Sequence, residues 1–256
     1  MWYLQIGSII KDEPDLSEWI AYHLSLGVER IVLYDNESDP PVQVMDPRVK
    51  VIRWPGRAQQ IRAYDHFCRH FLCEAVWSGV LDADEFVLPH RTNDLRDLLV
   101  GYQAYPGLAV NWQIFGSNGH QVRPTGLIVE NYTQRARAGF KVNAHVKLFL
   151  RATADHIRWE SPHEVTLGSG ISKVVNEKGE PLHGPFHTPS ISTIQINHYA
   201  SKSHEDMARK HHRGSVATGK RTRSWEVIKE LDQNEIEDRR ILRFSPRIKT
   251  QLAAWK

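Results

Sequence analysis

The chain has 256 residues, of which 41% are hydrophobic and 25% are charged, a composition that suits one large α/β domain, and its apolar runs are too short to span a bilayer. Its net charge is only +3, yet residues 202–256 hold 14 Lys and Arg against 8 Asp and Glu, while the remainder carries −3. A basic C-terminal end indicates an anionic partner such as phosphate groups, anionic lipid or nucleic acid, although a solvated helix face would show the same pattern.

The first 80 residues alternate between strand and helix patterns. The start, MWYLQIGSII, lacks the basic segment and long apolar stretch of a signal peptide, and we interpret it as a strand. Asp15 and Glu18 have the spacing of a capping box at the start of a helix that ends at Gly27. The pattern predicts strands at 3–10, 30–34, 49–52 and 76–81, and a second helix at 58–73. This order favours a parallel, doubly wound sheet.

The rest of the chain is less regular. We expect strands at 108–112, 147–150 and 191–197, and mostly helix in the basic segment 203–256. The two cysteines lie five residues apart in the second helix, where they form neither a disulfide framework nor a zinc knuckle, and they indicate a reducing cytoplasm. No repeat or linker is evident, so we predict one domain with a helical C-terminal extension.

Three carboxylates follow the strand at 76–81, in the stretch GVLDADEFVLP. Asp82 and Asp84 lie two residues apart, so on an extended chain both side chains point to the same side and repel each other. A divalent cation removes that repulsion, and Mg²⁺ or Mn²⁺ prefers carboxylates together with phosphate oxygens. The pattern therefore favours a metal–diphosphate site, with a solvated loop as the alternative.

Polar residues also follow the first two predicted strands, where Lys11 and Glu13 come after one and Asp35 after the other. Because parallel strands end at the same edge of a sheet, we expect these groups to lie near Asp82 and Asp84. A simple Asx turn is the alternative interpretation of Asp35.

Six blocks of sequence, in order from about residue 6 to 214, resemble glycosyltransferases of the GT-A fold. The nearest resemblance is to family 92-like enzymes and their bacterial relatives near family 2. The blocks are KDEPDLSEWIAYHLSLGVERIVLYDNESD, QIRAYDHFC, GVLDADEFVLP, VNWQIFGSNGH, HVKLFLR with a later PHEV, and INHYASKSHEDMARKHHRG. The resemblance implies a Rossmann-like, mostly parallel central sheet flanked by helices over residues 1–214. Residues 215–256 carry no match and form the predicted basic helical extension.

The resemblance, together with the chemistry of the side chains, implies a nucleotide-diphospho sugar donor, most simply a UDP-sugar, and a Mn²⁺ or Mg²⁺ ion. Lys11, Glu13 and Asp35 would hold the nucleotide, and the Asp35 carboxylate could accept from the uracil imide. Asp82 would reach the ribose or metal-bound water, and Asp84 would bind the metal directly. Glu85 would brace the loop.

Downstream residues complete the predicted donor site. His198, which follows the last predicted strand, is a candidate further metal ligand, with a purely structural histidine as the alternative. Lys202 would neutralise the leaving diphosphate, and Arg209 or Arg213 could form a second clamp.

The predicted acceptor side contains an aromatic block and candidate bases. The resemblance and the flat apolar rings of Trp112 and Phe115 point to sugar contact, and Ser117 and His120 belong to the same block. An ordinary buried strand with a turn is the alternative. An inverting transfer needs a general base, for which Glu164 is the leading candidate. His163 and His120 are alternatives.

Two other classes of protein remain as competing interpretations. One is a different metal–phosphate enzyme, namely a phosphatase with an Asp-x-Asp nucleophile or a nucleotidyltransferase. The other is a non-catalytic basic module that binds a membrane or a nucleic acid, although no RNA-binding motif with interleaved aromatic residues is visible.

The residues and the resemblance together predict a cytoplasmic, metal-dependent hexosyltransferase acting on a saccharide or lipid-linked acceptor in cell-surface polysaccharide synthesis, and the resemblance implies that the transfer inverts. Galactose is the donor sugar that the resemblance implies. The basic end could keep the enzyme at the inner face of the cell membrane, and no nucleic-acid partner is expected.

Overall fold

The computed structural model describes residues 1–154, 156–168, 174–214, 218 and 224–255. Its first half has the predicted order of elements, with bounds close to those expected from the sequence. These are β1 (Trp2–Ile10), α1 (Leu16–Ser25), β2 (Arg30–Asp35), β3 (Val49–Arg53), α2 (Gln60–Phe71) and β4 (Ala75–Val80). β1 pairs in parallel with both β2 and β4, and β2 pairs in parallel with β3. The predicted parallel βα unit is confirmed.

The second half extends this unit into an eight-stranded sheet in the order β3-β2-β1-β4-β8-β6-β11-β5. The added strands are β5 (Glu85–Pro89), β6 (Gly107–Ile114), β8 (Val146–Arg151) and β11 (Ile194–His198). β8 is antiparallel to β4 and β6, and β5 is antiparallel to β11. The α/β fold with a mostly parallel sheet is therefore confirmed, with β5 and β8 running against the other six strands.

This strand order brings many polar residues to one edge. The carboxyl ends of β1, β2, β4, β6 and β11 lie there, together with the amino ends of β5 and β8. Loops at the carboxyl ends of parallel strands are the usual place for a ligand site in an open α/β sheet.

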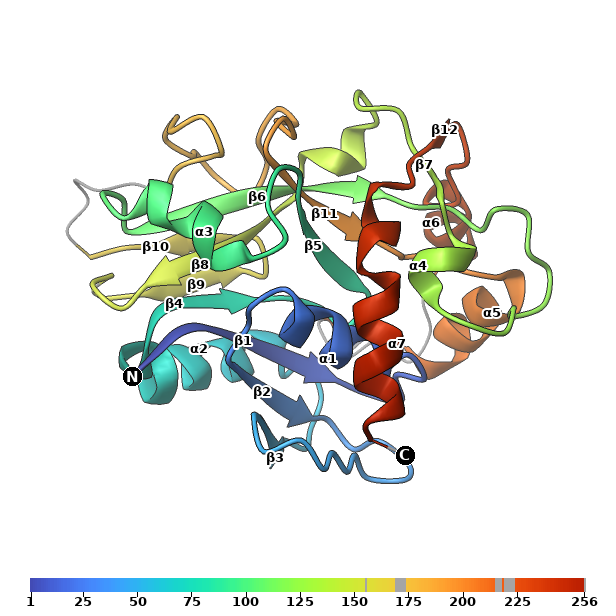
Figure 1. The fold of residues 1–256 in the computed structure, drawn as a ribbon, viewed down its shortest axis with the longest axis horizontal. Coiled ribbons are helices and arrows are strands. Elements are labelled where there is room, and N and C mark those ends of the chain that lie inside the picture. The colour runs from blue at the N-terminus through green and yellow to red at the C-terminus, as the bar shows by residue number, and fades with distance from the viewer. Residues whose placement is uncertain (155, 169–173, 215–217, 219–223, 256) are drawn as a thin grey trace.

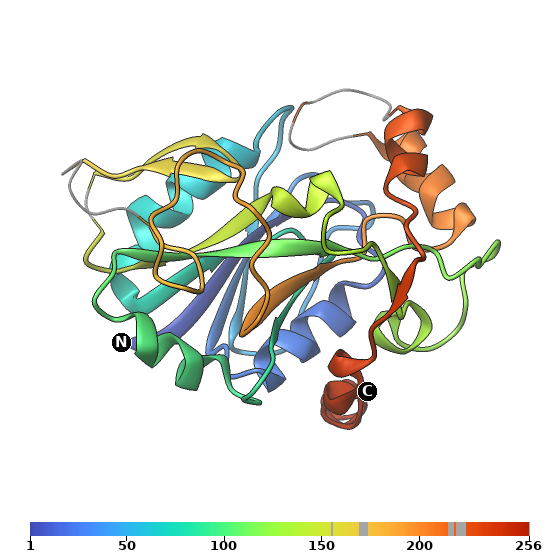
Figure 2. The ribbon, with the colours of Figure 1, turned by 90° about the horizontal axis from the view of Figure 1, so that it is seen from above.

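Helices cover both faces of the sheet (Figures 1 and 2). α1 and α7 pack on one face, against a core that includes Ile6, Leu33 and Phe149. α2 and the hairpin of β9 (Arg158–Ser161) and β10 (Glu164–Thr166) pack on the other face, against Leu148 and its neighbours. Leu148 and Phe149 belong to opposite faces because successive residues of a strand alternate.

Short elements complete the fold at its periphery. They are α3 (Leu95–Leu99), α4 (Ile128–Asn131), β7 (Gln134–Arg135) and the 3₁₀ turns η1 (Leu72–Glu74), η2 (Val100–Tyr102), η3 (Lys141–Ala144) and η4 (Arg240–Phe244). Among the residues described, no helix is long and apolar enough to cross a membrane.

The C-terminal part returns to the main body. It contains α5 (His204–Arg213), α6 (Trp225–Glu230), β12 (Ile236–Glu237) and α7 (Ser245–Ala253). β12 pairs with β7, and the ring of Phe244 before α7 lies 5.4 Å from that of Tyr22 on α1. The predicted extension begins at residue 215, which lies outside the described ranges, as do Lys220, Arg221 and Arg223 of the basic segment.

Candidate active site

The three acids of the segment GVLDADEFVLP form a turn between β4 and β5. Glu85 holds this turn, because its side-chain Oε2 accepts from the Asp82 backbone N–H at 2.9 Å, while its own N–H donates to the Asp82 carbonyl at 3.1 Å. Burial raises the pKa of the Glu85 carboxyl well above its ordinary value. Glu85 thus braces the loop in the way that the sequence predicted.

Asp82 is bound by partners from the sheet and from α2. The Lys147 ammonium on β8 lies 3.0 Å from Asp82 Oδ2, while Gln60 and Tyr64 on α2 donate to Oδ1 at 2.7 and 3.2 Å. Lys147 is fully buried and also lies 3.5 Å from Glu85 Oε1. Burial alone would raise the pKa of Asp82, but the charge of Lys147 outweighs it and lowers that pKa. Both oxygens of Asp82 are therefore engaged.

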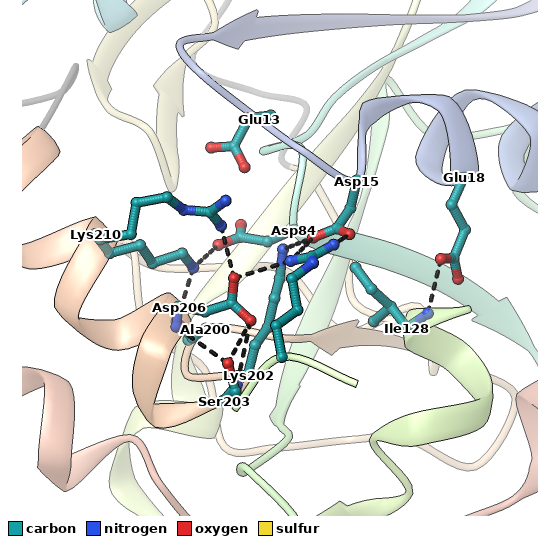
Figure 3. Close-up of polar contacts among 12 residues, drawn as sticks. Glu13, Asp15, Glu18, Asp84, Ile128, Ala200, Lys202, Ser203, Asp206 and Lys210 are labelled. Atoms are coloured by element: carbon teal, nitrogen blue, oxygen red, sulfur yellow. Dashed lines mark hydrogen bonds and ion pairs between the residues drawn. The ribbon is translucent and has the colours of Figure 1, made fainter. Parts of the chain in front are cut away.

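Asp84 is bound by partners from α5 and β11, and Figure 3 shows the contact with Lys210 of α5. The Lys210 ammonium lies 2.5 Å from Asp84 Oδ2 and also donates to the Ala200 carbonyl at 2.7 Å. His198 Nε2 lies 3.4 Å from Asp84 Oδ1. Against the effect of burial, Lys210 and His198 hold the pKa of Asp84 well below its ordinary value. Asp84 therefore stays a carboxylate at neutral pH.

Asp84 and His198 are also the residues that could hold a metal ion. A carboxylate oxygen and an imidazole nitrogen are both suitable donors for Mn²⁺, and His198 Nδ1 is buried without a hydrogen-bond partner in the structure. The described residues contain no group of three or more His, Cys, Asp and Glu side chains that could hold a metal. The donor set fits an ion that takes its remaining ligands from phosphate oxygens and water, as Mg²⁺ usually does.

Lys202 lies in a buried ion-pair network that joins the starts of α1 and α5 (Figure 3). Its ammonium is fully buried and lies 2.5 Å from Asp15 Oδ2, and Arg123 bridges Asp15 and Asp206. Burial lowers the pKa of Lys202. In this arrangement Lys202 connects α5 to α1, and its predicted contact with the diphosphate stays a prediction.

The predicted capping box at Asp15 and Glu18 is wrong. Asp15 occupies the N-cap position of α1 but makes no side-chain cap hydrogen bond, because Lys202 and Arg123 take its carboxylate. The Glu18 carboxylate instead accepts from the backbone N–H groups of Ile128 and Val129 at the start of α4, at 2.7 and 3.1 Å. Burial raises the pKa of Glu18 to about 7.

The loop after β1 is attached to the end of α5. Arg213 pairs with the Glu13 carboxylate and donates to the Lys11 carbonyl at 2.6 Å. Arg209, by contrast, pairs with Asp206 at 2.7 Å on its own helix. Of the two predicted clamps, only Arg213 faces the loop that carries Lys11 and Glu13.

Asp35 forms the turn that follows β2. Its two oxygens accept from the backbone N–H groups of Ser38 and Val42, each at 3.0 Å, and the residue is buried. The Asp35 side chain therefore stabilises the turn, but through N–H groups three and seven residues on and not through the N–H two residues on that defines the Asx turn of the alternative interpretation. A nucleotide contact by Asp35 stays a prediction, and it would require one of these bonds to be shared.

The aromatic block of β6 is buried. Trp112 stacks on His145 with 4.8 Å between ring centroids, and the rings of His163 and His198 lie 4.8 and 4.2 Å away from it. Phe115 has no exposed surface and packs on the ring of Tyr199. Because its ring is fully buried, Phe115 has no surface in this structure with which to contact a sugar as predicted.

Ser117 and His120 follow β6 in the chain, and their hydrogen-bond partners differ from the residues that surround Trp112. Ser117 is buried, and both its N–H and its hydroxyl bond to Asp232. His120 Nε2 lies 3.2 Å from the Asn131 carbonyl, and its own carbonyl accepts from the N–H of His204 at the start of α5. Ser117 is therefore tied to the segment after α6, and His120 supports the start of α5.

Two of the three candidate bases, His163 and Glu164, lie in the hairpin of β9 and β10. His163 Nδ1 lies 2.9 Å from the Val146 carbonyl, and burial, together with the charge of Lys147, lowers the pKa of His163 to about 3. Glu164 begins β10 and is half-buried. His163 is neutral at pH 7, so one of its ring nitrogens can accept a hydrogen bond from a hydroxyl. The carboxyl oxygens of Glu164 can accept one as well.

Four residues of this site were missed from the sequence. Lys147, Gln60 and Tyr64 lie inside blocks that carried the family resemblance, and a lysine within the apolar run HVKLFLR was itself a signal. Lys210 was passed over in favour of Lys202, Arg209 and Arg213, because charge alone does not tell which face of a helix meets a carboxylate.

Comparison with known proteins confirms the resemblance seen in the sequence. A protein of Ricinus communis named a glycosyltransferase family 92 protein is 35% identical over 141 residues, which cover 48% of this chain and 24% of the relative. One of Oryza sativa subsp. japonica is 32% identical over 133 residues, covering 48% and 23%. A longer alignment, to a Ricinus communis protein of the same family name, is 30% identical over 219 residues, covering 79% and 36%.

The chain thus spans about a quarter to a third of the length of these relatives. No family model matches it. A structure of UDP-glucose pyrophosphorylase complexed with UDP-glucose aligns along the whole chain, but at 8% identity and a TM-score of 0.36 this likeness is too weak to support an argument.

Proposed function

We propose that this chain, a relative of the family 92 glycosyltransferases, is a metal-dependent glycosyltransferase that moves a hexose from a nucleotide-diphospho sugar to a saccharide or glycolipid acceptor. The observation that carries the proposal is the pairing of Asp84 with Lys210 and His198 at the carboxyl edge of the sheet. This arrangement places an ionised carboxylate, a lysine and an imidazole together where a diphosphate could bind.

Charge is the main demand of the reaction, because the bond between sugar and phosphate breaks and leaves a negatively charged diphosphate. Lys210 would stabilise this negative charge, since its ammonium can turn from Asp84 to a phosphate oxygen without leaving the site. Arg213, on the same helix, can add a second positive charge next to Glu13. A Mn²⁺ or Mg²⁺ ion held by Asp84 and His198 would supply further positive charge to the diphosphate.

Asp82 is proposed to orient the donor rather than to bind the ion. Its Oδ2 is tied to Lys147 and its Oδ1 to Gln60 and Tyr64, so it is a fixed acceptor for a ribose hydroxyl or a water molecule. UDP-sugars, with UDP-galactose first, are the proposed donors, and the resemblance supports this choice.

The acceptor hydroxyl must lose a proton during the transfer. Glu164 is the proposed base, because His163 is poorly basic in its buried position. Direct displacement with Glu164 as base gives inversion. If Glu164→Gln leaves turnover unchanged while Asp84→Ala abolishes it, another group is the base.

The basic C-terminal end supports a proposal about location. We place the enzyme in the cytoplasm at the inner face of the cell membrane, acting on a lipid-linked saccharide during polysaccharide assembly. The 14 Lys and Arg against 8 Asp and Glu over residues 202–256 support an attraction to anionic lipid. Unchanged fractionation after substitution of the exposed Arg239 and Arg247 by Glu, which leaves the buried residues of the segment in place, would count against it.

A donor screen tests the central proposal. Hydrolysis and transfer are measured with UDP-, GDP- and dTDP-sugars, with and without Mn²⁺, for the wild type, for Asp84→Asn and for the control Asp97→Asn on the surface of α3. We expect Mn²⁺-dependent turnover of a UDP-sugar that is lost only in Asp84→Asn. Absence of turnover with every donor, or turnover that ignores Mn²⁺, would refute the proposed mechanism.

A further inference from the structure

One large aromatic side chain is exposed close to the candidate active site. Phe186 keeps 56% of its surface exposed, and its backbone forms a β-bridge with that of His145, just before β8. His145 stacks on Trp112, Trp112 lies 4.2 Å from His198, and His198 contacts Asp84. A continuous set of packed rings therefore connects Asp84 to the exposed ring of Phe186.

The segment that carries Phe186 is firmly held although its ring is exposed. The next residue, His187, donates its N–H to the Ala144 carbonyl at 2.8 Å, and its own carbonyl accepts from Asn111 on β6 at 3.1 Å. In both overall views the loop before β11 lies beside η3, in agreement with these bonds (Figures 1 and 2). An exposed ring on a fixed backbone loses little conformational entropy when a ligand binds to it.

The two ends of this segment are joined through one carboxylate. Glu177 is buried and accepts hydrogen bonds at 2.6 to 3.2 Å from the backbone or hydroxyl groups of Ser190, Ser192, Thr193 and Ile194. The ring of Phe186 itself meets that of His145 edge to face, with 4.6 Å between centroids and 89° between planes. The position of the Phe186 ring is thus fixed by the backbone of its segment and by its contact with the ring of His145.

Polar groups suited to hydroxyls lie around the same segment. Glu164 Oε1 comes within 4.0 Å of where a Cβ would stand on Gly184, two residues before Phe186. The ring of His163 lies 4.9 Å from that of His145. Because His163 Nδ1 must donate to the Val146 carbonyl, its Nε2 is left as an acceptor.

We propose that Phe186 is the platform on which the acceptor saccharide stacks, with Glu164 and His163 next to the hydroxyl groups of the bound sugar. A pyranose has an apolar face of C–H groups that matches an aromatic ring and a rim of hydroxyls that needs acceptors. The site rests on the proposed function, because it supplies the acceptor for that reaction. It replaces Trp112 and Phe115, whose rings are buried, as the aromatic contact with sugar.

Saccharide binding to the full chain tests the platform without needing turnover. Saturation-transfer NMR is recorded with methyl β-galactopyranoside and methyl β-glucopyranoside on the wild type, Phe186→Ala, Phe186→Tyr and Trp2→Ala. Trp2 is the matched control, since it is 43% exposed at the amino end of β1, opposite the site edge. UDP binding is measured in parallel by calorimetry.

We expect Phe186→Ala to bind the glycosides roughly tenfold more weakly, the order that follows from loss of one large contact side chain, and to bind UDP like the wild type. Phe186→Tyr and Trp2→Ala should bind both ligands like the wild type. Equal glycoside binding by Phe186→Ala and the wild type, or no glycoside binding by the wild type, overturns the platform. Glycoside binding that depends on Phe186 in a protein that binds no UDP upholds the platform and contradicts the proposed donor.

Discussion

Asp82 and Asp84 lie two residues apart but are held in different ways. The partners of Asp82 are Lys147, Gln60 and Tyr64, which come from the sheet and from α2. Asp84 meets His198 at the end of β11 and Lys210 of α5, the helix that follows that strand. The comparison shows that Asp82 is held within the scaffold of sheet and α2, whereas the contact of Asp84 with Lys210 depends on the position of α5.

The largest expected effect is a loss in the free energy of unfolding when the partner of Asp82 on β8 is changed. Lys147→Met should lower the free energy of unfolding by about 3–5 kcal/mol, because it leaves Asp82 and the fully buried Glu85 next to each other without a positive charge. Urea denaturation measures it, with the exposed Lys178→Met as the control. The double variant Lys147→Met/Glu85→Gln should regain part of the loss. A loss below about 1 kcal/mol for Lys147→Met would show that Lys147 is not essential to the scaffold.

The next largest effect should be a loss of turnover when the partner of Asp84 on α5 is changed. Lys210→Met should lower kcat by about 10²-fold, the order expected when one positive group facing developing charge is removed. Arg209→Met is the matched control on the same helix, since Arg209 pairs with Asp206 and not with Asp84. Steady-state kinetics with the donor found in the screen compare the two. Equal losses in both variants would mean that Lys210 acts only by seating α5.

The pH dependence of turnover sharpens the same contrast. Burial raises the pKa of Asp84, and Lys210 is the largest influence that lowers it, so the net pKa lies well below the ordinary value. Removal of Lys210 should therefore raise the pKa of Asp84 and move the acid limb of the residual activity to higher pH. The pH profile of Lys210→Met measures this shift. An acid limb at the wild-type position would show that Asp84 does not control that limb.

The sequence predicted what depends on local pattern. The strands of the first half and the helix at 60–71 follow from apolar periodicity, and the strand ends brought Asp82 and Asp84 to the predicted edge. The insertion of β8 between β4 and β6 was not predictable in this way, because it depends on pairing between distant segments. Lys147 became a partner of Asp82 only through that insertion.

Long-range ion pairs explain the clearest failure. Asp15 and Glu18 have the correct spacing for a capping box, but Lys202 and Arg123 are far along the chain and bind Asp15 more strongly than a backbone N–H would. The exposed ring of Phe186, which we propose as the acceptor platform, gave no signal in the sequence because it lies in a loop without periodicity. Local propensity thus located the acids, whereas tertiary contacts decided which cations and rings meet them.

The smallest predicted effect concerns how α5 begins. The Ser203 hydroxyl accepts from the Asp206 N–H at 3.1 Å and donates to the Asp206 carboxylate at 2.8 Å. The same carboxylate also accepts from the Ser203 N–H, so the two residues form a capping box at the start of the helix. Ser203→Ala should therefore lower the free energy of unfolding by about 1 kcal/mol, the usual cost of losing an N-cap side chain.

Because α5 carries Lys210, the same variant should lower turnover slightly, whereas a change on the scaffold side of Asp82 should not act through this helix. Ser224→Ala is the matched control, since Ser224 occupies the N-cap of α6 without a side-chain cap hydrogen bond. Urea denaturation and donor turnover are measured for both variants. If Ser224→Ala costs as much as Ser203→Ala, the cap does not seat α5, and the dependence of Asp84 on that helix would have to come from the ion pairs of Asp15 with Lys202 and Arg123 instead.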